Sequence, residues 1–359
     1  MKHLINLLVS LLLLVSYIPQ AYSAEQKISK SETFSGNKTK SLPVFFATDR
    51  VSKQMKKGHL AFGAQDPTVF DKLIYGATNT GEGARQDNTI ADREDKQNEE
   101  LANTSTPLNE TTYKDYAEFE ASLLQAVNRS GKQDIVIFVH GCCENFERVA
   151  RQAEQLGIAT DSPVISYDWG TPMANYFGSL VAHPRSQERF NQFILNVLKT
   201  FPNKRISIVG LSMGNALIYN FCLQTPVSQM PRLFDNISIA RADIDSFAFQ
   251  TNMEKVLSHS KRVQLYVASN DFLINLSGFL RKMAWAKSPF FMLGHQSSKP
   301  TLKPQFEVYD ISKLKLGHKL PKDLIAEVIK SNHGAPSKSL AYSFANSRSG
   351  IIIVQADKS

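Results

Sequence analysis

Apolar and polar positions along the chain switch repeatedly between a strand period and a helix period. Short runs of β-branched and aromatic residues, typical of buried strands, lie at residues 43–48, 135–139, 164–169, 206–211, 237–240, 263–268 and 306–309. Helix-length segments separate most of these runs, and in residues 144–156 the apolar side chains recur three or four positions apart. Strands that alternate with helices predict an α/β fold with a mostly parallel central sheet and helices on both faces.

The N-terminal residues follow a different pattern. Lys2 lies just before an apolar run at residues 4–18, and small residues at Ala21 and Ser23 come next. A basic start, a short apolar stretch and small residues at this spacing are typical of a secretory signal peptide. We therefore expect residues 1–23 to be a signal peptide and the protein to be exported, to the periplasm or as a secreted protein.

Two polar segments set the other expected boundaries. Residues 24–42 are rich in Lys, Ser and Thr and are predicted to form a polar N-terminal tail. Residues 76–112 carry many Asn, Thr, Glu and Asp and few bulky apolar side chains, which indicates a polar surface insertion. Residues 43–359 show no further boundary, so one domain is expected.

Composition and charge narrow the class of protein. The 42% of hydrophobic residues is ordinary for a globular protein, and the formal net charge of +8 favours anionic partners only weakly. No run of basic residues interleaved with aromatics suggests nucleic-acid binding. Three cysteines are too few for a disulfide scaffold and allow one disulfide at most within the chain.

The motif Gly-x-Ser-x-Gly at residues 210–214 is the strongest candidate for chemistry. The buried strand at residues 206–211 leads into it, and an apolar helical pattern follows. Such a strand–turn–helix elbow presents the serine hydroxyl at the end of the strand, while Gly210 and Gly214 leave space for neighbouring backbone. Ser212 is therefore the expected nucleophile.

A serine nucleophile requires donors that stabilise an oxyanion. The strand at residues 135–139 ends in the loop 140–143, the position from which such folds supply one donor amide. The backbone N–H groups of Cys142 and Met213 are the expected oxyanion donors. His140 precedes the nucleophile in chain order and is interpreted as a residue that orients this loop.

An acid is expected at the end of the strand after the nucleophile. The strand at residues 263–268 is followed by Asp271, which is the favoured acid. Asp243 and Asp245, at the end of the preceding strand, are the alternatives. Each of these carboxylates could instead form an Asx turn or a helix cap.

The base is expected among the three histidines that follow Asp271. His318 comes shortly after the strand at residues 306–309 and before a helix expected near Pro321, which is where such folds place the base. His333 follows that helix and is the alternative. His295 follows an aromatic stretch without the expected strand-to-loop pattern and is the least favoured.

Several blocks of this chain resemble those of a known family. Residues 43–50, 139–141, 212–215, 242–245, 266–271 and 317–318 are similar, in the same order, to motifs of the bacterial α/β hydrolases grouped as domain of unknown function 900. The resemblance spans residues 43 to about 330. It implies an α/β-hydrolase fold, with Ser212, Asp271 and His318 as the triad of an esterase or lipase.

These observations lead to an expected function. A serine hydrolase that cleaves carboxylic esters through an acyl-enzyme requires no cofactor or metal, and no His, Cys or Asp spacing suggests one. Apolar clusters at residues 272–280 and 285–293 are interpreted as ordinary core and surface helix, and the alternative is an acyl pocket or lid. That alternative favours an acyl-ester or lipid-like substrate and a peripheral membrane contact. A peptidase or thioesterase with the same triad, or a non-catalytic exported binding or envelope protein, is the alternative.

Overall fold

The computed structural model describes most of the chain after residue 42. The described residues are 43–54, 60–62, 73–79, 109–172, 175–229, 234–284, 291–295, 303, 305–331, 342–347 and 349–356. The expected signal peptide, the N-terminal tail and His333 lie outside them.

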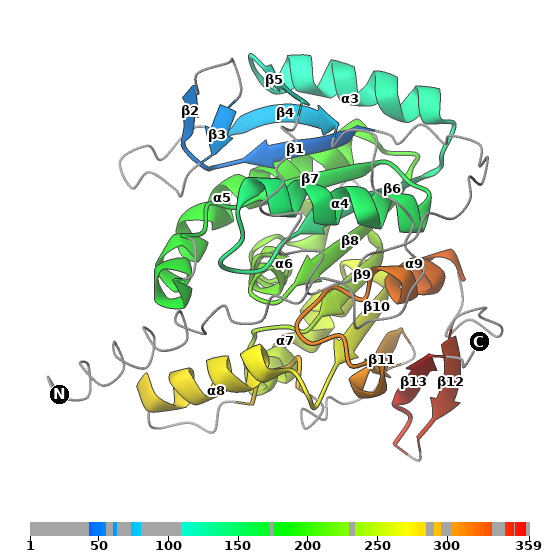
Figure 1. Cartoon of the computed structure of the whole chain (residues 1–359). Helices are drawn as coiled ribbons and strands as arrows, with labels where there is room; N and C mark the ends of the chain where they lie inside the picture. Colours follow the sequence, from blue (N-terminus) through cyan, green and yellow to red (C-terminus); the bar gives the residue numbers. More distant parts are fainter. Residues whose placement is uncertain are drawn as a thin grey trace, which may run out of the picture. The chain divides into compact units, whose positions relative to one another are not determined.

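Eleven strands form the central sheet, in the order β12-β13-β11-β10-β9-β8-β6-β7-β1-β4-β5 (Figure 1). The strands are β1 (Val44–Thr48), β4 (Ile74–Asn79), β5 (Asn109–Tyr113), β6 (Asp134–Val139), β7 (Val164–Asp168), β8 (Arg205–Leu211), β9 (Phe234–Ala240), β10 (Ser260–Val267), β11 (Phe306–Asp310), β12 (Tyr342–Asn346) and β13 (Ile352–Ala356). A separate ribbon pairs β2 (Ser52–Gln54) with β3 (Leu60–Phe62).

Helices connect most of the neighbouring parallel strands. They are α3 (Tyr116–Ser130), α4 (Phe146–Thr160), α5 (Tyr176–Thr200), α6 (Gly214–Gln224), α7 (Ser246–Leu257), α8 (Phe272–Ala284) and α9 (Lys322–Lys330). The strands from β1 to β13 in the sheet order pair in parallel, and the pairs β1–β4, β4–β5 and β12–β13 are antiparallel. The predicted α/β fold with a mostly parallel sheet is confirmed.

Both ends of the polar insertion predicted at residues 76–112 are strands. Its two ends belong to β4 and β5, which pair with each other in the register Tyr75–Tyr113 to Asn79–Asn109. β5 lies at the edge of the sheet, where one face of a polar, Thr-rich strand can remain in contact with water. Polarity alone therefore did not distinguish this edge strand from a loop.

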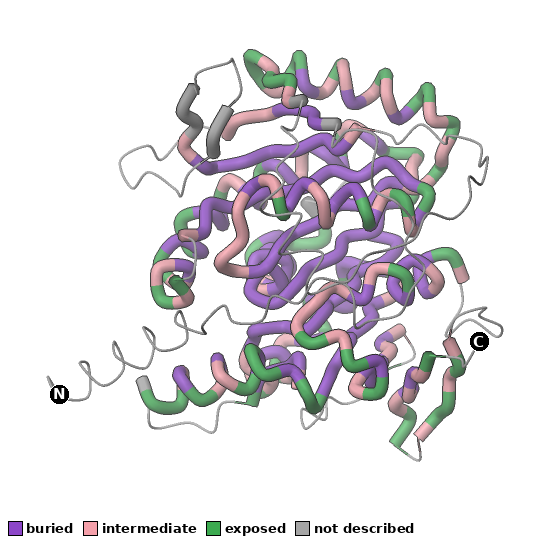
Figure 2. Tube along the Cα trace, viewed as in Figure 1, coloured by how far each residue is buried: buried purple, intermediate pink, exposed green. Residues whose placement is uncertain are grey.

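Alternate side chains of each inner strand enter the two faces of the sheet. In β6, Ile135, Ile137 and Val139 join the core on one face, whereas Val136 and Phe138 join the core on the other. Helices α3, α5, α6 and α7 cover the first face, and α4 and α9 cover the second. The inner strands are consequently buried along their length (Figure 2).

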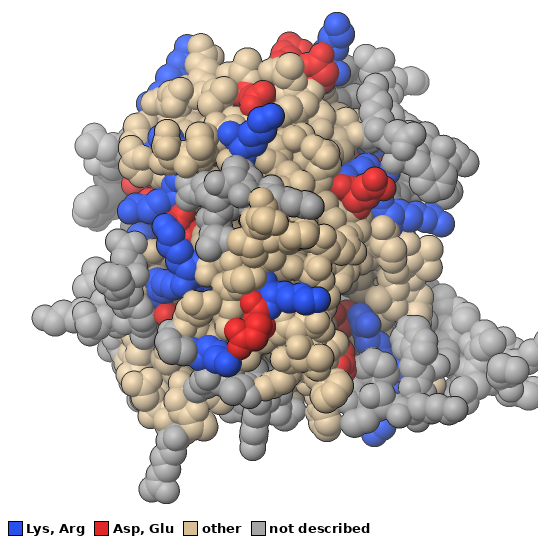
Figure 3. All heavy atoms as spheres, turned by 180° about the vertical axis from the view of Figure 1, so that it is seen from behind, with Lys and Arg blue, Asp and Glu red and all other residues tan. Residues whose placement is uncertain are grey.

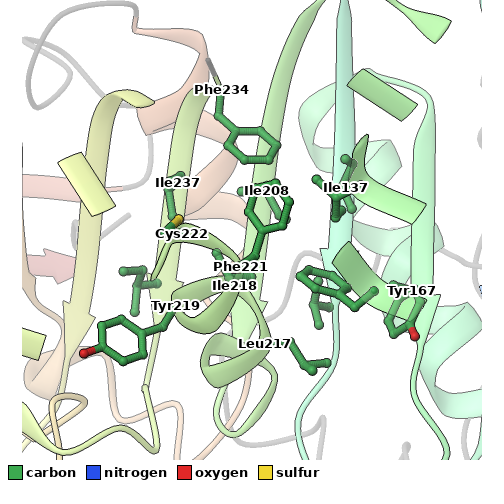
Figure 4. Close-up of a cluster of buried hydrophobic side chains, with 14 of the residues drawn as sticks. Ile137, Tyr167, Ile208, Leu217, Ile218, Tyr219, Phe221, Cys222, Phe234 and Ile237 are labelled. Carbon is green, nitrogen blue, oxygen red and sulfur yellow. The ribbon is translucent and has the colours of Figure 1, made fainter. Parts of the chain in front are cut away.

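Helix α6 shows how this packing anchors the site. Its side chains Leu217, Ile218 and Phe221 are buried against the sheet, close to Ile208 and Ile237 of the strands beneath (Figure 4). Burial of each such side chain contributes about 1.5–3 kcal/mol. The N-terminus of α6 is therefore held firmly at the end of β8.

No helix among the described residues combines the length and the apolar character needed to cross a membrane.

Candidate active site

The turn between β8 and α6 carries Ser212 at the carboxyl edge of the sheet. The backbone φ of Ser212 is +52°, a left-handed conformation that a residue other than glycine adopts only under constraint. Hydrogen bonds supply that constraint: the Ser212 N–H donates to the Ala240 carbonyl at 3.0 Å, and the Ser212 carbonyl accepts from the Asp243 N–H at 3.2 Å. The side chain of Asn215 also donates to the Ser212 carbonyl, at 3.1 Å.

The two glycines of the motif are required by close packing around this turn. A Cβ atom on Gly214 would lie 2.2 Å from the His140 carbonyl oxygen and 2.7 Å from that of Val139. A Cβ atom on Gly210 would lie 2.2 Å from the side-chain oxygen of Asn215. The strand–elbow–helix geometry expected from the sequence therefore leaves no room for a side chain at either position.

Asp271 and His318 form a hydrogen-bonded pair at the same edge. The Nδ1 atom of His318 lies 2.9 Å from Oδ1 and 2.8 Å from Oδ2 of Asp271. Asp271 follows β10 and is fully buried, and His318 lies in the loop after β11 with a side chain that is 20% exposed. A carboxylate on Nδ1 fixes the ring so that Nε2 is the atom available for proton transfer.

Arg241 binds the Asp271 carboxylate of this pair and was not recognised in the sequence. Its guanidinium group is fully buried and donates from one terminal nitrogen to Oδ2 of Asp271 at 2.8 Å. Its Nε donates to the Lys319 carbonyl at 2.9 Å, beside His318. Arg241 thus holds both the carboxylate and the loop that carries the histidine, and nothing in the local sequence marks it as buried.

These contacts determine the charge state of Asp271. Burial disfavours the carboxylate, but the hydrogen bond to His318 and the positive charges of His318 and Arg241 outweigh this effect, so the pKa of Asp271 is lowered. A lowered pKa in the folded state means that ionised Asp271 stabilises the fold above the unfolded-state pKa. That contribution is lost as the pH falls through the folded-state value.

The lowered pKa of Asp271 predicts that the stability of the fold depends on pH in the acid range. The stability of the wild type relative to Asp271→Asn is expected to decline as the pH falls below about 4, the ordinary pKa of an aspartate. Urea unfolding of both proteins at pH values on either side of this point measures the difference. A difference that does not change with pH would contradict the assigned ionisation.

The loop after β6 lies directly against the elbow. A Cβ atom on Gly141 would be 3.0 Å from Cβ and 3.7 Å from Oγ of Ser212. The backbone amides of Cys142 and Met213 donate to no acceptor among the described residues. These two amides, the expected oxyanion donors, are therefore not engaged by another described group, and Met213 directly follows Ser212.

His140 stabilises the base of this loop. The side chain is fully buried, and its Nε2 lies 3.0 Å from Oδ1 of Asp168. The carboxylate of Asp168 accepts hydrogen bonds from Arg50 and Thr48. The indole N–H of Trp169 donates to the His140 carbonyl at 2.9 Å. These contacts match the interpretation of His140 as a residue that orients the loop.

The alternative acids occupy other positions. Asp245 caps α7 by accepting from the Ala248 N–H at 2.8 Å. Asp243 accepts from the Tyr176 hydroxyl at 2.8 Å and from Ser277 at 3.1 Å. Neither shares a hydrogen bond with His318 among the described contacts, whereas Asp271 does. His295 is half-buried, with its N–H donating to the Met292 carbonyl.

The three cysteines are free thiols. The Sγ atoms of Cys142 and Cys143 lie 2.8 Å apart, and this contact lowers the pKa of Cys143 while it raises that of Cys142. Cys222 is buried in α6. Within the described parts of the chain, no group of three or more His, Cys, Asp or Glu side chains is placed to hold a metal ion.

Fold and site together define a class of protein. A mostly parallel sheet between two layers of helices, with a strained serine between a strand and a helix, is the architecture of the α/β hydrolases. The family model described as alpha/beta hydrolase of unknown function (DUF900) matches residues 115–329, more than half of the chain, and the chain belongs to this family. A comparison with curated proteins finds no match.

Proposed function

We propose that this hydrolase cleaves carboxylic esters through an acyl-enzyme, with Ser212 as nucleophile, His318 as general base and Asp271 as the acid that orients it. The observation that carries the proposal is the Asp271–His318 pair at the sheet edge that also presents Ser212. A carboxylate, an imidazole and a strained serine at one edge of the sheet are the three groups that a serine hydrolase requires.

The proposed reaction follows from the hydrogen bonds of His318. Because Asp271 accepts from Nδ1, Nε2 is free to take the Ser212 proton as the serine oxygen bonds to the ester carbonyl carbon. The amides of Cys142 and Met213 would stabilise the resulting oxyanion. His318 then returns the proton to the departing alcohol as the ester C–O bond breaks.

Water releases the acyl group in the second half of the reaction. His318 takes a proton from the water as its oxygen attacks the acyl carbon, and the proton passes to Ser212 when the acyl–serine bond breaks. Asp271 remains ionised throughout and stabilises the imidazolium, which agrees with its lowered pKa.

Covalent labelling tests the assignment of Ser212. A fluorophosphonate probe is expected to label the wild type and to leave Ser212→Ala unlabelled, because an activated serine displaces fluoride from the probe and becomes phosphonylated. Ser207→Ala, in the buried part of β8, is a matched control that should keep its labelling. Absence of labelling in folded wild type, or equal labelling of Ser212→Ala, would contradict the proposal.

A further inference from the structure

Exposed apolar side chains gather at the edge of the sheet that carries the candidate site. Among the described residues, ten large apolar side chains are more than a third exposed. Eight of these, here called the apolar rim, are Phe177, Val181, Phe247, Phe272, Leu273, Phe279, Met283 and Phe291. The other two lie toward the opposite edge, Ile158 in the last turn of α4 and Val227 just after the end of α6. Isolated exposed apolar residues are ordinary, but a concentration on one edge is not.

Helix α8 contributes half of the apolar rim. Phe272, Leu276, Phe279 and Met283 recur four, three and four residues apart, so they share one helical face. Phe272 is 66% and Phe279 is 55% exposed, although this is the face that a surface helix ordinarily makes polar. Figure 2 shows exposed positions along α8, in contrast to the buried strands behind it.

Contacts between elements show that the parts of the rim are neighbours. From the middle and end of α8, Ser277 donates to Asp243 at 3.1 Å and Arg281 pairs with the same carboxylate at 3.3 Å. The hydroxyl of Tyr176, next to Phe177 in α5, donates to Asp243 as well. Asp243 follows β9, so α8 stays at the carboxyl edge and lies beside the start of α5.

The remaining members join at the start of α7. The N–H of Ser246, adjacent to Phe247, donates to the carbonyl of Phe291 at 2.8 Å. A Cβ atom on Gly278 of α8 would lie 3.3 Å from Met292, next to Phe291. The first turns of α5 and α7, the loop at residue 291 and the whole of α8 therefore form one continuous rim.

Two segments at this edge carry basic side chains and no acidic ones. Residues 272–284 and 311–322 contain no Asp or Glu, but they include Arg281, Lys282 and four further lysines. The two segments are adjacent, because the Asn270 side chain donates to the Ser312 carbonyl at 3.0 Å. Lys282, Lys313 and Lys315 are exposed. On the face opposite to the view of Figure 1, basic and acidic side chains lie interspersed instead (Figure 3).

We propose that the apolar rim docks on an anionic phospholipid membrane and that the ester substrate is drawn from that membrane. Apolar side chains would enter the boundary between headgroups and acyl chains, and the lysines would contact the lipid phosphates. A two-fold dimer through this face would instead bring the same basic segments against each other with no acid in them to pair. The docking stands independently of the proposed function, whereas the choice of a lipid ester rests on it.

Vesicle binding tests the docking directly. The wild type is expected to sediment with vesicles of phosphatidylcholine and phosphatidylglycerol and to bind pure phosphatidylcholine vesicles less. Phe272→Ser/Phe279→Ser should bind the anionic vesicles roughly tenfold less tightly or worse, since two apolar anchors are lost. Ile158→Ser/Val227→Ser removes two exposed apolar side chains elsewhere and should bind like the wild type.

A reporter on α8 distinguishes this face from any other lipid-binding part of the chain. Tryptophan fluorescence from Phe279→Trp is expected to be quenched by brominated phospholipids, beyond the change seen in the wild type. Ile158→Trp is the matched control and should show no added quenching. Equal quenching of both variants would overturn the proposal. It would also be overturned if the wild type bound no lipid and formed a concentration-dependent dimer that Phe272→Ser/Phe279→Ser abolishes.

Hydrolysis separates the two parts of the inference. Phe272→Ser/Phe279→Ser should lose release of fatty acid from vesicles and keep hydrolysis of a soluble short-chain ester. Ser212→Ala should lose both reactions and still bind vesicles. If the wild type binds vesicles but hydrolyses no ester, the ester reaction alone is overturned. If Phe272→Ser/Phe279→Ser and the wild type release fatty acid from vesicles at the same rate, the membrane is not the source of the substrate.

Discussion

Replacement of His318 by alanine is expected to lower kcat/KM for an ester by roughly 10⁴- to 10⁶-fold. The Nδ1 atom of His318 is bound to the buried carboxylate of Asp271, which leaves its Nε2 as the proposed proton acceptor. A serine without a base is a weak nucleophile at neutral pH. Steady-state hydrolysis of a chromogenic ester measures the loss.

His333→Ala provides the matched control for this prediction. His333 was the alternative base in the sequence, and it is expected to be replaceable with little change in kcat/KM. His318→Ala should also keep the unfolding midpoint of the wild type within a few degrees, because its side chain is partly exposed. Activity retained in His318→Ala and lost in His333→Ala would reverse the assignment of the base.

Gly214→Ala is expected to destabilise the fold by about 3 kcal/mol or more. The added methyl group would overlap two carbonyl oxygens, those of His140 at 2.2 Å and Val139 at 2.7 Å. Backbone cannot move aside as a flexible side chain can, so α6 would have to separate from the end of β6 and the loop at residues 140–143. Urea unfolding followed by circular dichroism measures the loss.

Gly278→Ala is the matched substitution in α8. Its methyl group would lie 3.3 Å from the flexible side chain of Met292, and alanine favours the helix by about 0.5–1 kcal/mol over glycine. We expect this variant to be as stable as the wild type or slightly more stable. Equal losses in Gly214→Ala and Gly278→Ala would show that the close approach at the elbow is not what requires glycine.

The architecture could be predicted because buried parallel strands have a strong local signature. The runs around Ile137 and Ile208 are apolar on both faces and alternate with helical periods, and each became an inner strand. The edges could not be predicted in the same way. The polar strand Asn109–Tyr113 is fixed by pairing with β4, a long-range contact that leaves little trace in its own residues.

Some residues of the candidate site could likewise be predicted from local sequence, and others could not. Gly210, Ser212 and Gly214 form a local motif with its own geometry, so they could be recognised from the sequence. The pairing of His318 with Asp271 could be predicted only from the order in which such folds place the acid and the base along the chain. The preference for His318 over His333 depended on the predicted start of the helix near Pro321. Arg241 could not be found, because only the tertiary structure shows that its guanidinium group is buried against a carboxylate.

Asp271 has a second set of contacts, which tie it to the start of helix α8. Its Oδ1 accepts from the Ile274 N–H at 3.2 Å and its carbonyl accepts from the Asn275 N–H at 3.1 Å, so α8 begins on the residue that binds His318. A hinge that swung α8 outward would pull this carboxylate away from the imidazole. The first turn of α8 and the orientation of His318 are therefore coupled through a single residue, Asp271.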